Sequence, residues 1–347
     1  MNPDTLPNGH QLNLQRYTIT QLSRQSASYF TYEGHDKAAN KAVIIKEYFF
    51  ENHTKRNADG TLEFDKTISP LFLRYKPKVI KLIEQLSQVR HPHLVEILDY
   101  FTENNTVYLV LKKVGGQTLY NMVLKSGALP EKEGVLLLFQ VASALEKLHE
   151  HNLYHLNVSP DNILISPSGK AVLIDYLMLN ESTKFFRWIL KSSITSRYTP
   201  LEVIHRQQQT GNFSDVYSLA ATFYFGLSGT MPLHITERMH NHLPGPQAFN
   251  KVISHATDET LMKALSTRPE LRFQQVDEFV WDLASQHKNY YQYLHKIDFP
   301  LPPEINLTPK HDFNEVVVHA MSNIPWRLII YLALLGMFFT IAWLLLS

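Results

Sequence analysis

One stretch constrains the fold of this 347-residue chain more than any other: residues 151–175, HNLYHLNVSPDNILISPSGKAVLID. It is a polar loop followed by two short apolar blocks. The pattern predicts a strand over 162–165, a turn over 167–169 and a second strand over 171–174 that ends at Asp175. The sequence therefore predicts a hairpin with polar residues at both of its ends.

This stretch resembles the catalytic loop and metal-binding strand of protein kinases, whose patterns are H-R-D-L-K-P-x-N and D-F-G. The loop here reads HLNVSPDN over 155–162, and Asp175 follows at the usual interval. The resemblance implies that Asn162 and Asp175 would hold Mg²⁺ if a nucleotide binds. It also places Asn157 at the position of the catalytic base and Ser159 at that of a lysine. An amide has no basicity near neutral pH, so we expect Asn157 to be inactive.

A second motif lies upstream in the order that the family uses. VIIKEYF over 43–49 resembles the V-A-I-K strand, most closely the V-A-I-K-E-Y form of bacterial serine/threonine kinases. The resemblance makes Lys46 the lysine that contacts nucleotide phosphates. Ile44 and Phe30 align with the family's alanine and valine beside the adenine, and we expect their extra volume to fill that pocket. A shifted backbone that leaves room is the alternative.

Other residues that kinases use to bind and position a nucleotide are missing from this sequence. The glycine-rich loop aligns with residues 23–28, SRQSAS, which contain no glycine, so side chains obstruct the approach of phosphate to backbone. Leu82 stands where helix C should carry a glutamate that pairs with Lys46, and Leu177 replaces the glycine of D-F-G. An assembled kinase site needs that lysine–glutamate pair.

By the same resemblance, the chain retains residues that stabilise the family's fold. Asp215 takes the position that supports the catalytic-loop backbone, and Glu202 and Arg272 take the positions of a buried ion pair. Breaking such a pair on one side costs about 3–5 kcal/mol. The family's packed regulatory spine is expected at His155, Tyr176, Leu86 and Ile97.

The fold class implied is α+β: a two-lobed protein kinase fold with an antiparallel β N-lobe plus helix C, a mainly helical C-lobe and a C-terminal transmembrane helix. The expected divisions are an N-terminal extension (1–14), the N-lobe (15–114), the C-lobe (115–295), a Pro-rich stalk (296–323) and the transmembrane helix (324–347).

The transmembrane prediction comes from the residues themselves. The last 20 residues, 328–347, are uncharged and would span about 30 Å as a helix, the thickness of a bilayer core. A buried core helix is the alternative, but such helices normally show a polar face. Arg327 lies on the N-terminal side, which favours a membrane protein with a single C-terminal anchor and its kinase-like domain in the cytoplasm.

Composition narrows the function. A formal net charge of +1 gives no reason to expect a nucleic-acid partner.

We expect a membrane-anchored pseudokinase that serves as a signalling scaffold or regulator by binding unidentified proteins, with no cofactor required. The alternative is a divergent active serine/threonine kinase that uses ATP. A third, intermediate case binds ATP, with Mg²⁺, as a structural ligand that switches the affinity for partners.

Overall fold

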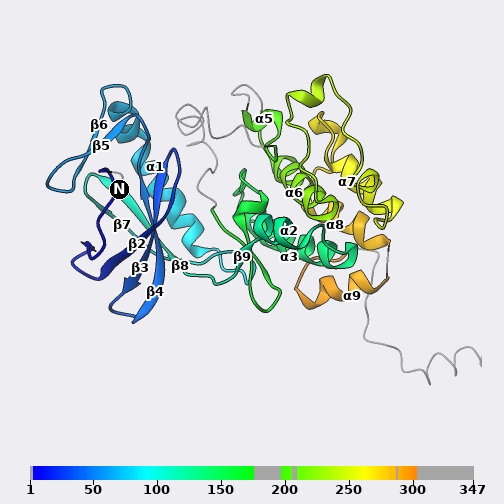
Figure 1. The fold of residues 1–347 in the computed structure, drawn as a ribbon, viewed down its shortest axis with the longest axis horizontal. Coiled ribbons are helices and arrows are strands. Elements are labelled where there is room, and N and C mark those ends of the chain that lie inside the picture. The colour runs from blue at the N-terminus through cyan, green and yellow to red at the C-terminus, as the bar shows by residue number, and fades with distance from the viewer. Residues whose placement is uncertain (1–2, 176–196, 205–208, 287, 303–347) are drawn as a thin grey trace, which may run out of the picture. The chain divides into compact units, whose positions relative to one another are not determined.

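A computed structural model of the chain describes residues 3–175, 197–204, 209–286 and 288–302. Residues 1–300 form one compact unit, in which strands occupy the N-terminal part and helices most of the rest (Figure 1). Nearly all of the remaining residues lie outside the described ranges.

The N-terminal lobe is built on a six-stranded antiparallel sheet of order β1-β2-β3-β4-β8-β7. Asparagine makes its tightest turn: Asn104 and Asn105 both have positive φ (50° and 62°), as a two-residue hairpin loop between β7 and β8 requires. The strands are β1 (Gln11–Leu12), β2 (Tyr17–Gln25), β3 (Tyr29–Asp36), β4 (Lys41–Tyr48), β7 (Ile97–Glu103) and β8 (Thr106–Lys112).

An insertion follows β4 and contains structure of its own. Strands β5 (Thr54–Arg56) and β6 (Leu62–Phe64) form a hairpin that precedes helix α1 (Ser69–Gln88). Its Arg56 Nη2 lies 2.5 Å from the carboxylate of Glu47, which is fully buried on β4. Arg56 also binds Asp4 of the N-terminal arm, through its amide (3.0 Å) and its Nε (2.8 Å). The insertion and the arm are thereby fixed to the sheet.

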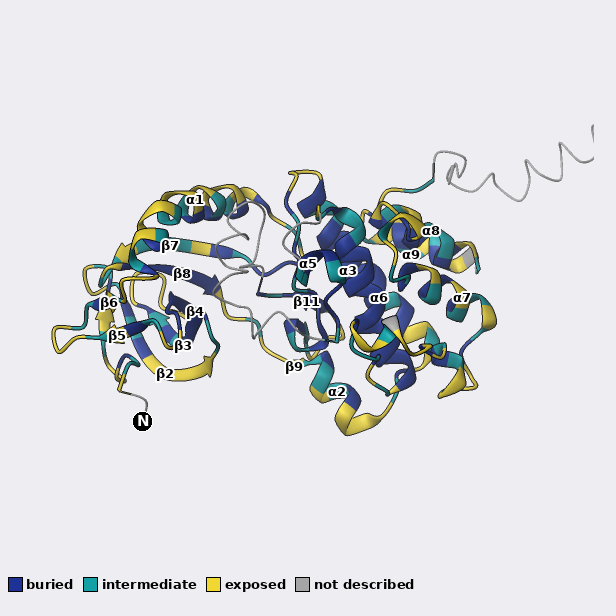
Figure 2. Ribbon diagram, turned by 90° about the horizontal axis from the view of Figure 1, so that it is seen from above, coloured by how far each residue is buried: buried dark blue, intermediate teal, exposed yellow. Residues whose placement is uncertain are grey.

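The C-terminal lobe is mainly helical around α6 (Asn212–Ser228), in which every residue from 214 to 228 is buried. Figure 2 shows α3 and α6 as buried helices and exposed residues mainly on the outer ones. A small antiparallel sheet contains the hairpin predicted over 162–175 and has the order β11-β10-β9. The elements are β9 (Gln117–Thr118), α2 (Leu119–Ser126), α3 (Glu131–His149), η1 (Pro160–Asn162), β10 (Ile163–Ile165), β11 (Ala171–Leu173), α5 (Leu201–Ile204), η3 (Glu237–Met239), η4 (Pro246–Ala248), α7 (His255–Ala264), η5 (Pro269–Leu271), α8 (Val276–Ser285) and α9 (Lys288–Lys296).

The predicted membrane helix requires a correction. In the described ranges, no helix is both long and apolar enough to cross a membrane. Helix α1 has 20 residues but contains several charged side chains, and the more apolar α6 has only 17. The segment predicted to span, 324–347, lies outside the described residues. The fold class with a membrane helix is therefore not supported. The predicted single-pass membrane location, with its cytoplasmic domain, depended on that helix and is corrected with it.

Candidate active site

The loop at 155–162 is held by one buried carboxylate. Asp215, at the start of α6, accepts hydrogen bonds from the backbone amides of His155 (2.8 Å) and Leu156 (2.7 Å) and from His149 Nε2 (2.8 Å). Leu156 has φ of 55°, a conformation that costs free energy for a branched side chain. His155 Nε2 donates to the carbonyl oxygen of Ile174 at 3.1 Å and so joins the loop to the strand before Asp175. Asp215 therefore supports a strained loop backbone.

Asn157 lies within this assembled loop. The side-chain amide of Asn162 donates to the Asn157 carbonyl oxygen (2.9 Å), and the backbone amide of Asn162 donates to the Ser159 carbonyl oxygen (3.0 Å). Asn157 is partly exposed, whereas Ser159 and Asn162 are buried. The side chain that the loop presents at position 157 is an amide, which cannot accept a proton near neutral pH.

Lys46 and Asp175 form a buried ion pair across the two lobes. Lys46 Nζ lies 2.5 Å from Asp175 Oδ1, and both side chains are less than one-tenth exposed. Burial by itself raises the pKa of Asp175, but the charge of Lys46 and the hydrogen bonds from Lys46 and Tyr29 outweigh burial and hold that pKa below its ordinary value. Asp175 also has φ of 67°, outside the usual range for a residue with a side chain.

Tyr29 is a site residue that the sequence analysis missed. Its hydroxyl donates to Asp175 Oδ2, and its ring centroid lies 4.0 Å from Lys46 Nζ. Burial and the charge of Asp175 raise the pKa of Tyr29 well above its ordinary value, so the phenol remains a neutral donor. The available signal was strand alternation: Tyr29 begins β3 and is two residues from Thr31, which is paired with Lys46.

Phe30 and Ile44, expected beside the adenine, have different surroundings. Phe30 is fully buried in the core of the N-terminal lobe, with its ring 4.3 Å from that of Phe49. It neighbours Tyr29 in β3 and so points to the opposite face, which makes Phe30 part of the sheet's core packing. Ile44 is only half-buried, two residues before Lys46 on β4.

The loop aligned with the family's glycine-rich segment closes on itself. Ser26 Oγ accepts from the amides of Ser28 (3.4 Å) and Tyr29 (3.2 Å), and the Ser26 amide donates to the Tyr29 carbonyl oxygen (3.0 Å). The carbonyl oxygens of Ala27 and Ser28 accept from the amides of Glu51 and Phe49. Backbone amides that would cradle phosphates are therefore used within the turn.

Helix α1 supplies no acidic partner to Lys46 among the described residues. Leu82, at the position expected for the glutamate, is half-buried and apolar. Glu84 is exposed, and its carboxylate accepts from the hydroxyl of Tyr100 on β7 at 3.1 Å. Lys46 instead contacts Asp175 directly. The lysine–glutamate contact of an assembled kinase site is thus replaced by a lysine–aspartate contact.

The remaining predicted structural residues are buried, where they lie in the described ranges. Leu86 on α1, Ile97 on β7 and His155 are each at most 3% exposed, whereas Tyr176 lies outside those ranges. Arg272 pairs with Glu202, with Nη1–Oε1 at 2.5 Å and Nη2–Oε2 at 3.2 Å. This pair links α5 to the segment before α8.

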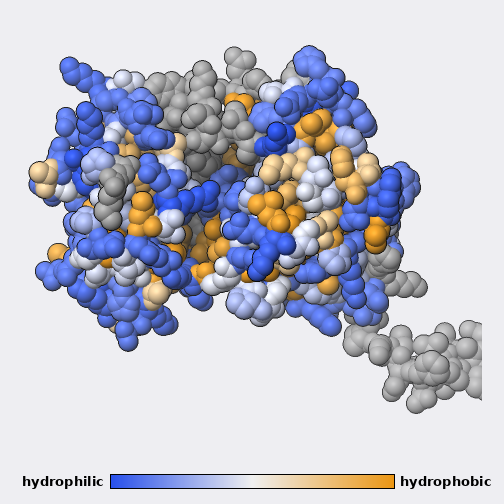
Figure 3. Space-filling model, viewed as in Figure 1, coloured by the Kyte–Doolittle hydropathy of each residue, from blue (hydrophilic) through white to orange (hydrophobic). Residues whose placement is uncertain are grey.

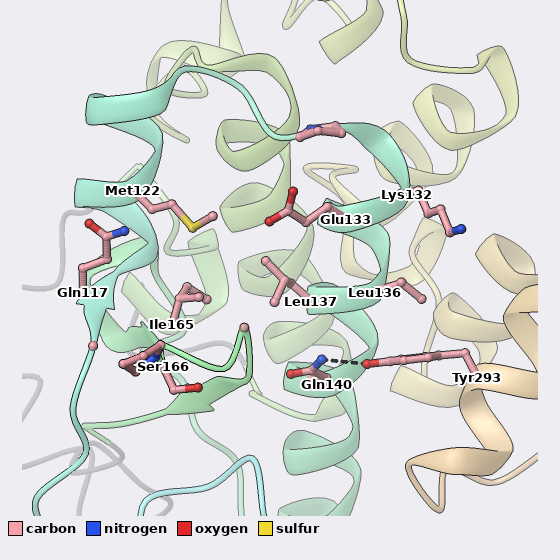
Figure 4. A pocket seen from close by; sticks show the side chains of 14 residues that line it. Gln117, Met122, Lys132, Glu133, Leu136, Leu137, Gln140, Ile165, Ser166 and Tyr293 are labelled. Carbon is pink, nitrogen blue, oxygen red and sulfur yellow. Dashed lines mark hydrogen bonds between the residues drawn. The ribbon is translucent and has the colours of Figure 1, made fainter.

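An apolar hollow lies away from this site. It has a volume of about 850 Å³ and lies among α2, α3, β10 and α9 (Figure 4). Met122, Leu136 and Ile165 give it an apolar lining, and Gln140 closes one side by donating to the Tyr293 hydroxyl at 2.6 Å. Figure 3 shows apolar surface gathered over α2 and α3, while the strand-rich lobe is mostly hydrophilic in that view.

Mg²⁺ with a nucleotide would require oxygen atoms from Asn162 and Asp175. Asn162 Oδ1 is buried and, among the described residues, has no hydrogen-bond partner, which suits a ligand for a hard cation. Both oxygens of Asp175 are engaged, one by Lys46 and one by Tyr29. The residues present therefore fit a magnesium nucleotide only in part.

Comparisons with known proteins agree with this architecture. A family model described as "Protein kinase domain" matches residues 32–287. A "Probable serine/threonine-protein kinase" of Clostridium perfringens is 24% identical over 292 residues, which cover 79% of this chain and 38% of that protein. Sperm motility kinase 3A of Mus musculus is 27% identical over 198 residues, which cover 56% of this chain and 39% of that protein. The chain thus matches about two-fifths of the length of these relatives.

Solved structures give the same fold. The structure titled "PpkA-294 apo form" has a TM-score of 0.68 at 23% identity and covers 81% of this chain and 99% of its own. Rad53 1-466 in complex with AMP-PNP has a TM-score of 0.57 at 18% identity and covers 77% of this chain and 64% of its own. At these identities the likeness establishes a two-lobed fold with an antiparallel N-lobe sheet and a helical C-lobe.

Proposed function

This chain belongs to the protein kinase family, and we propose that it is a pseudokinase, a signalling scaffold or regulator that acts by binding other proteins. One observation carries the proposal. Asp215 and Asn162 hold the loop at 155–162 in place, yet the loop presents Asn157 where phosphoryl transfer needs a carboxylate. The contacts that hold the loop in place are retained, whereas the residue that would act as the catalytic base is not.

Two further contacts support the proposal. Loss of a general base typically lowers the rate about 10²–10⁴-fold. The amides of Ser28 and Tyr29 are already bonded to Ser26 Oγ, so the phosphate cradle is lost as well. Because positioning and charge stabilisation supply most of the catalysis of phosphoryl transfer, losing both the base and the cradle leaves no useful turnover.

Radiolabel transfer from γ-labelled ATP to the full chain, and to a general protein acceptor, tests the proposal. We expect no signal above that of Asp175→Ala, and none from Asn157→Asp, because the cradle is also defective. Asn157→Ala is the matched control for the substitution itself, and an active serine/threonine kinase is the positive control. Transfer by the unaltered chain that disappears in Asp175→Ala would overturn the proposal.

A divergent active serine/threonine kinase is the second candidate. It is favoured by Asn162 Oδ1, which has no hydrogen-bond partner among the described residues, and by the retention of Lys46 and Asp175. A dissociative transition state needs little early proton abstraction, so loss of a base can be survived. Under this alternative the same assay shows transfer that requires both Asn162 and Asp175.

A further inference from the structure

The turn at 26–28 directs the side chain of Tyr29 toward Lys46 and Asp175. Ser26 accepts from the Tyr29 amide through Oγ (3.2 Å) and donates to the Tyr29 carbonyl oxygen through its own amide (3.0 Å). The next two carbonyl oxygens of the turn, those of Ala27 and Ser28, are held by the segment after β4. The backbone at Tyr29 is therefore fixed on both sides, and its side chain is only 5% exposed.

The phenol of Tyr29 contacts both groups that a nucleotide would need. A kinase-fold cleft uses its β-strand lysine for phosphate oxygens and the aspartate at the end of the hairpin for Mg²⁺. Here the Tyr29 hydroxyl takes one oxygen of Asp175, and the ring covers Lys46 Nζ at 4.0 Å. Lys46 takes the other oxygen at 2.5 Å. A triphosphate must displace the phenol before either group becomes available.

The two side chains that the motifs place beside the adenine have other surroundings. Ile44 is half-buried, and Phe30 packs into the core on the other face of the sheet. Lys112, the last residue of β8, and Lys113 after it are exposed. Among the described residues, the contacts that would exclude a nucleotide are therefore those at the phosphate end.

We propose that Tyr29 is an internal plug of the phosphate subsite, and that it is the residue that excludes magnesium nucleoside triphosphates. The proposal rests on the proposed function and deepens it, because it assigns the loss of nucleotide binding to one side chain. Removing the phenol frees Asp175 Oδ2, and Asn162 Oδ1 has no hydrogen-bond partner among the described residues, so both oxygens become available as ligands for Mg²⁺.

Thermal unfolding and calorimetric titration of the full chain with Mg-ATP test the plug. We expect no shift for the unaltered chain and, for Tyr29→Ala, a rise in Tm that grows with Mg-ATP concentration. Tyr29→Phe keeps the ring and loses the hydroxyl, and we expect it to gain about tenfold in affinity, the size of one hydrogen bond to a charged group. EDTA, or Asn162→Ala added to Tyr29→Ala, should remove the gain.

Tyr17→Phe is the matched control, because the Tyr17 hydroxyl donates to the carboxylate of Asp99 at 2.7 Å outside the cleft. It should leave Mg-ATP binding as in the unaltered chain. The plug is refuted if the unaltered chain binds Mg-ATP as tightly as the Tyr29 variants, or if folded Tyr29→Phe gains nothing. Phosphate transfer on the same samples keeps the two proposals apart. Binding without transfer in Tyr29→Ala supports both, whereas transfer by the unaltered chain overturns the proposed function.

Discussion

The ion pair of Arg272 and Glu202 gives a stability prediction whose size can be worked from the structure. Both side chains are at most 1% exposed, and two contacts of 2.5 and 3.2 Å join guanidinium to carboxylate. Arg272 Nε also donates to the Ser266 carbonyl oxygen at 2.7 Å, and the guanidinium stacks 4.8 Å from the centre of the Tyr217 ring. Arg272→Met removes all of these and leaves a buried carboxylate without its cation.

Two hydrogen bonds to charged groups, at about 1.5–3 kcal/mol each, suggest a loss of about 3–6 kcal/mol. Broken buried pairs cost about 3–5 kcal/mol, so we expect the free energy of unfolding to fall by about 4 kcal/mol. The double variant Glu202→Leu with Arg272→Met removes both charges. It should lose less than Arg272→Met alone, because apolar replacement of a whole buried pair is often near neutral.

Urea unfolding of the full chain, followed by fluorescence and circular dichroism, measures these values as a double-mutant cycle. Arg268→Met is the matched control. Arg268 lies in the same segment and pairs with Glu270 at 2.8 Å, but both are more than half exposed. We expect a cost below about 1 kcal/mol there. The reasoning is refuted if the two arginine variants cost the same, or if the double variant loses the sum of the two single losses.

Three further predictions concern stability, and urea titration measures each of them. Gly116→Ala should cost more than about 2 kcal/mol, because φ is +135° and the new Cβ would lie 2.2 Å from the Ile165 carbonyl oxygen; Gly115→Ala, with open space around it, should cost little. Asp215→Asn should cost about 3 kcal/mol, because one of the two backbone amides loses its acceptor and the other keeps only a neutral one. Burial lowers the pKa of His91 from 6.5 to about 4, so the unfolded chain takes up the proton first. The contribution of His91 to the free energy of unfolding is fully present above pH 6.5 and is lost as the pH falls toward 4. The loss at pH 5 is about 2 kcal/mol. His91→Asn should remove that contribution, and an unchanged pH slope would contradict the assignment.

The sequence predicts best the contacts that depend on motif spacing. Lys46, Asp175 and Asp215 sit in motifs whose order defines the two lobes, and the structure brings Asp215 to the loop backbone. The direct contact between Lys46 and Asp175 was not predicted. Side-chain direction near the turn at 26–28 was harder to predict. Because strand side chains alternate, an assignment displaced by one residue exchanges the two faces, which is how Tyr29 was missed beside Phe30.

The hairpin within the insertion could not be predicted from the sequence pattern either. The polar composition of residues 51–70 predicts an inserted loop, yet Leu62 is buried on one side of a short hairpin, and Arg56 contacts Glu47. A two-stranded hairpin is marginal without packing, so its stability comes from partners distant in sequence. Local periodicity carries no information about such partners.

The hydrogen bonds between the N-terminal arm and the insertion limit how far the N-terminus can be truncated. The family match begins at residue 32, but the arm at Asp4 holds Arg56, and the amide of Leu6 donates to the Tyr32 hydroxyl at 3.1 Å. A fragment trimmed to that boundary would lack two of the six strands and the start of a third, and would open Glu47 to water. Work on isolated pieces of this protein should therefore start at its first residues.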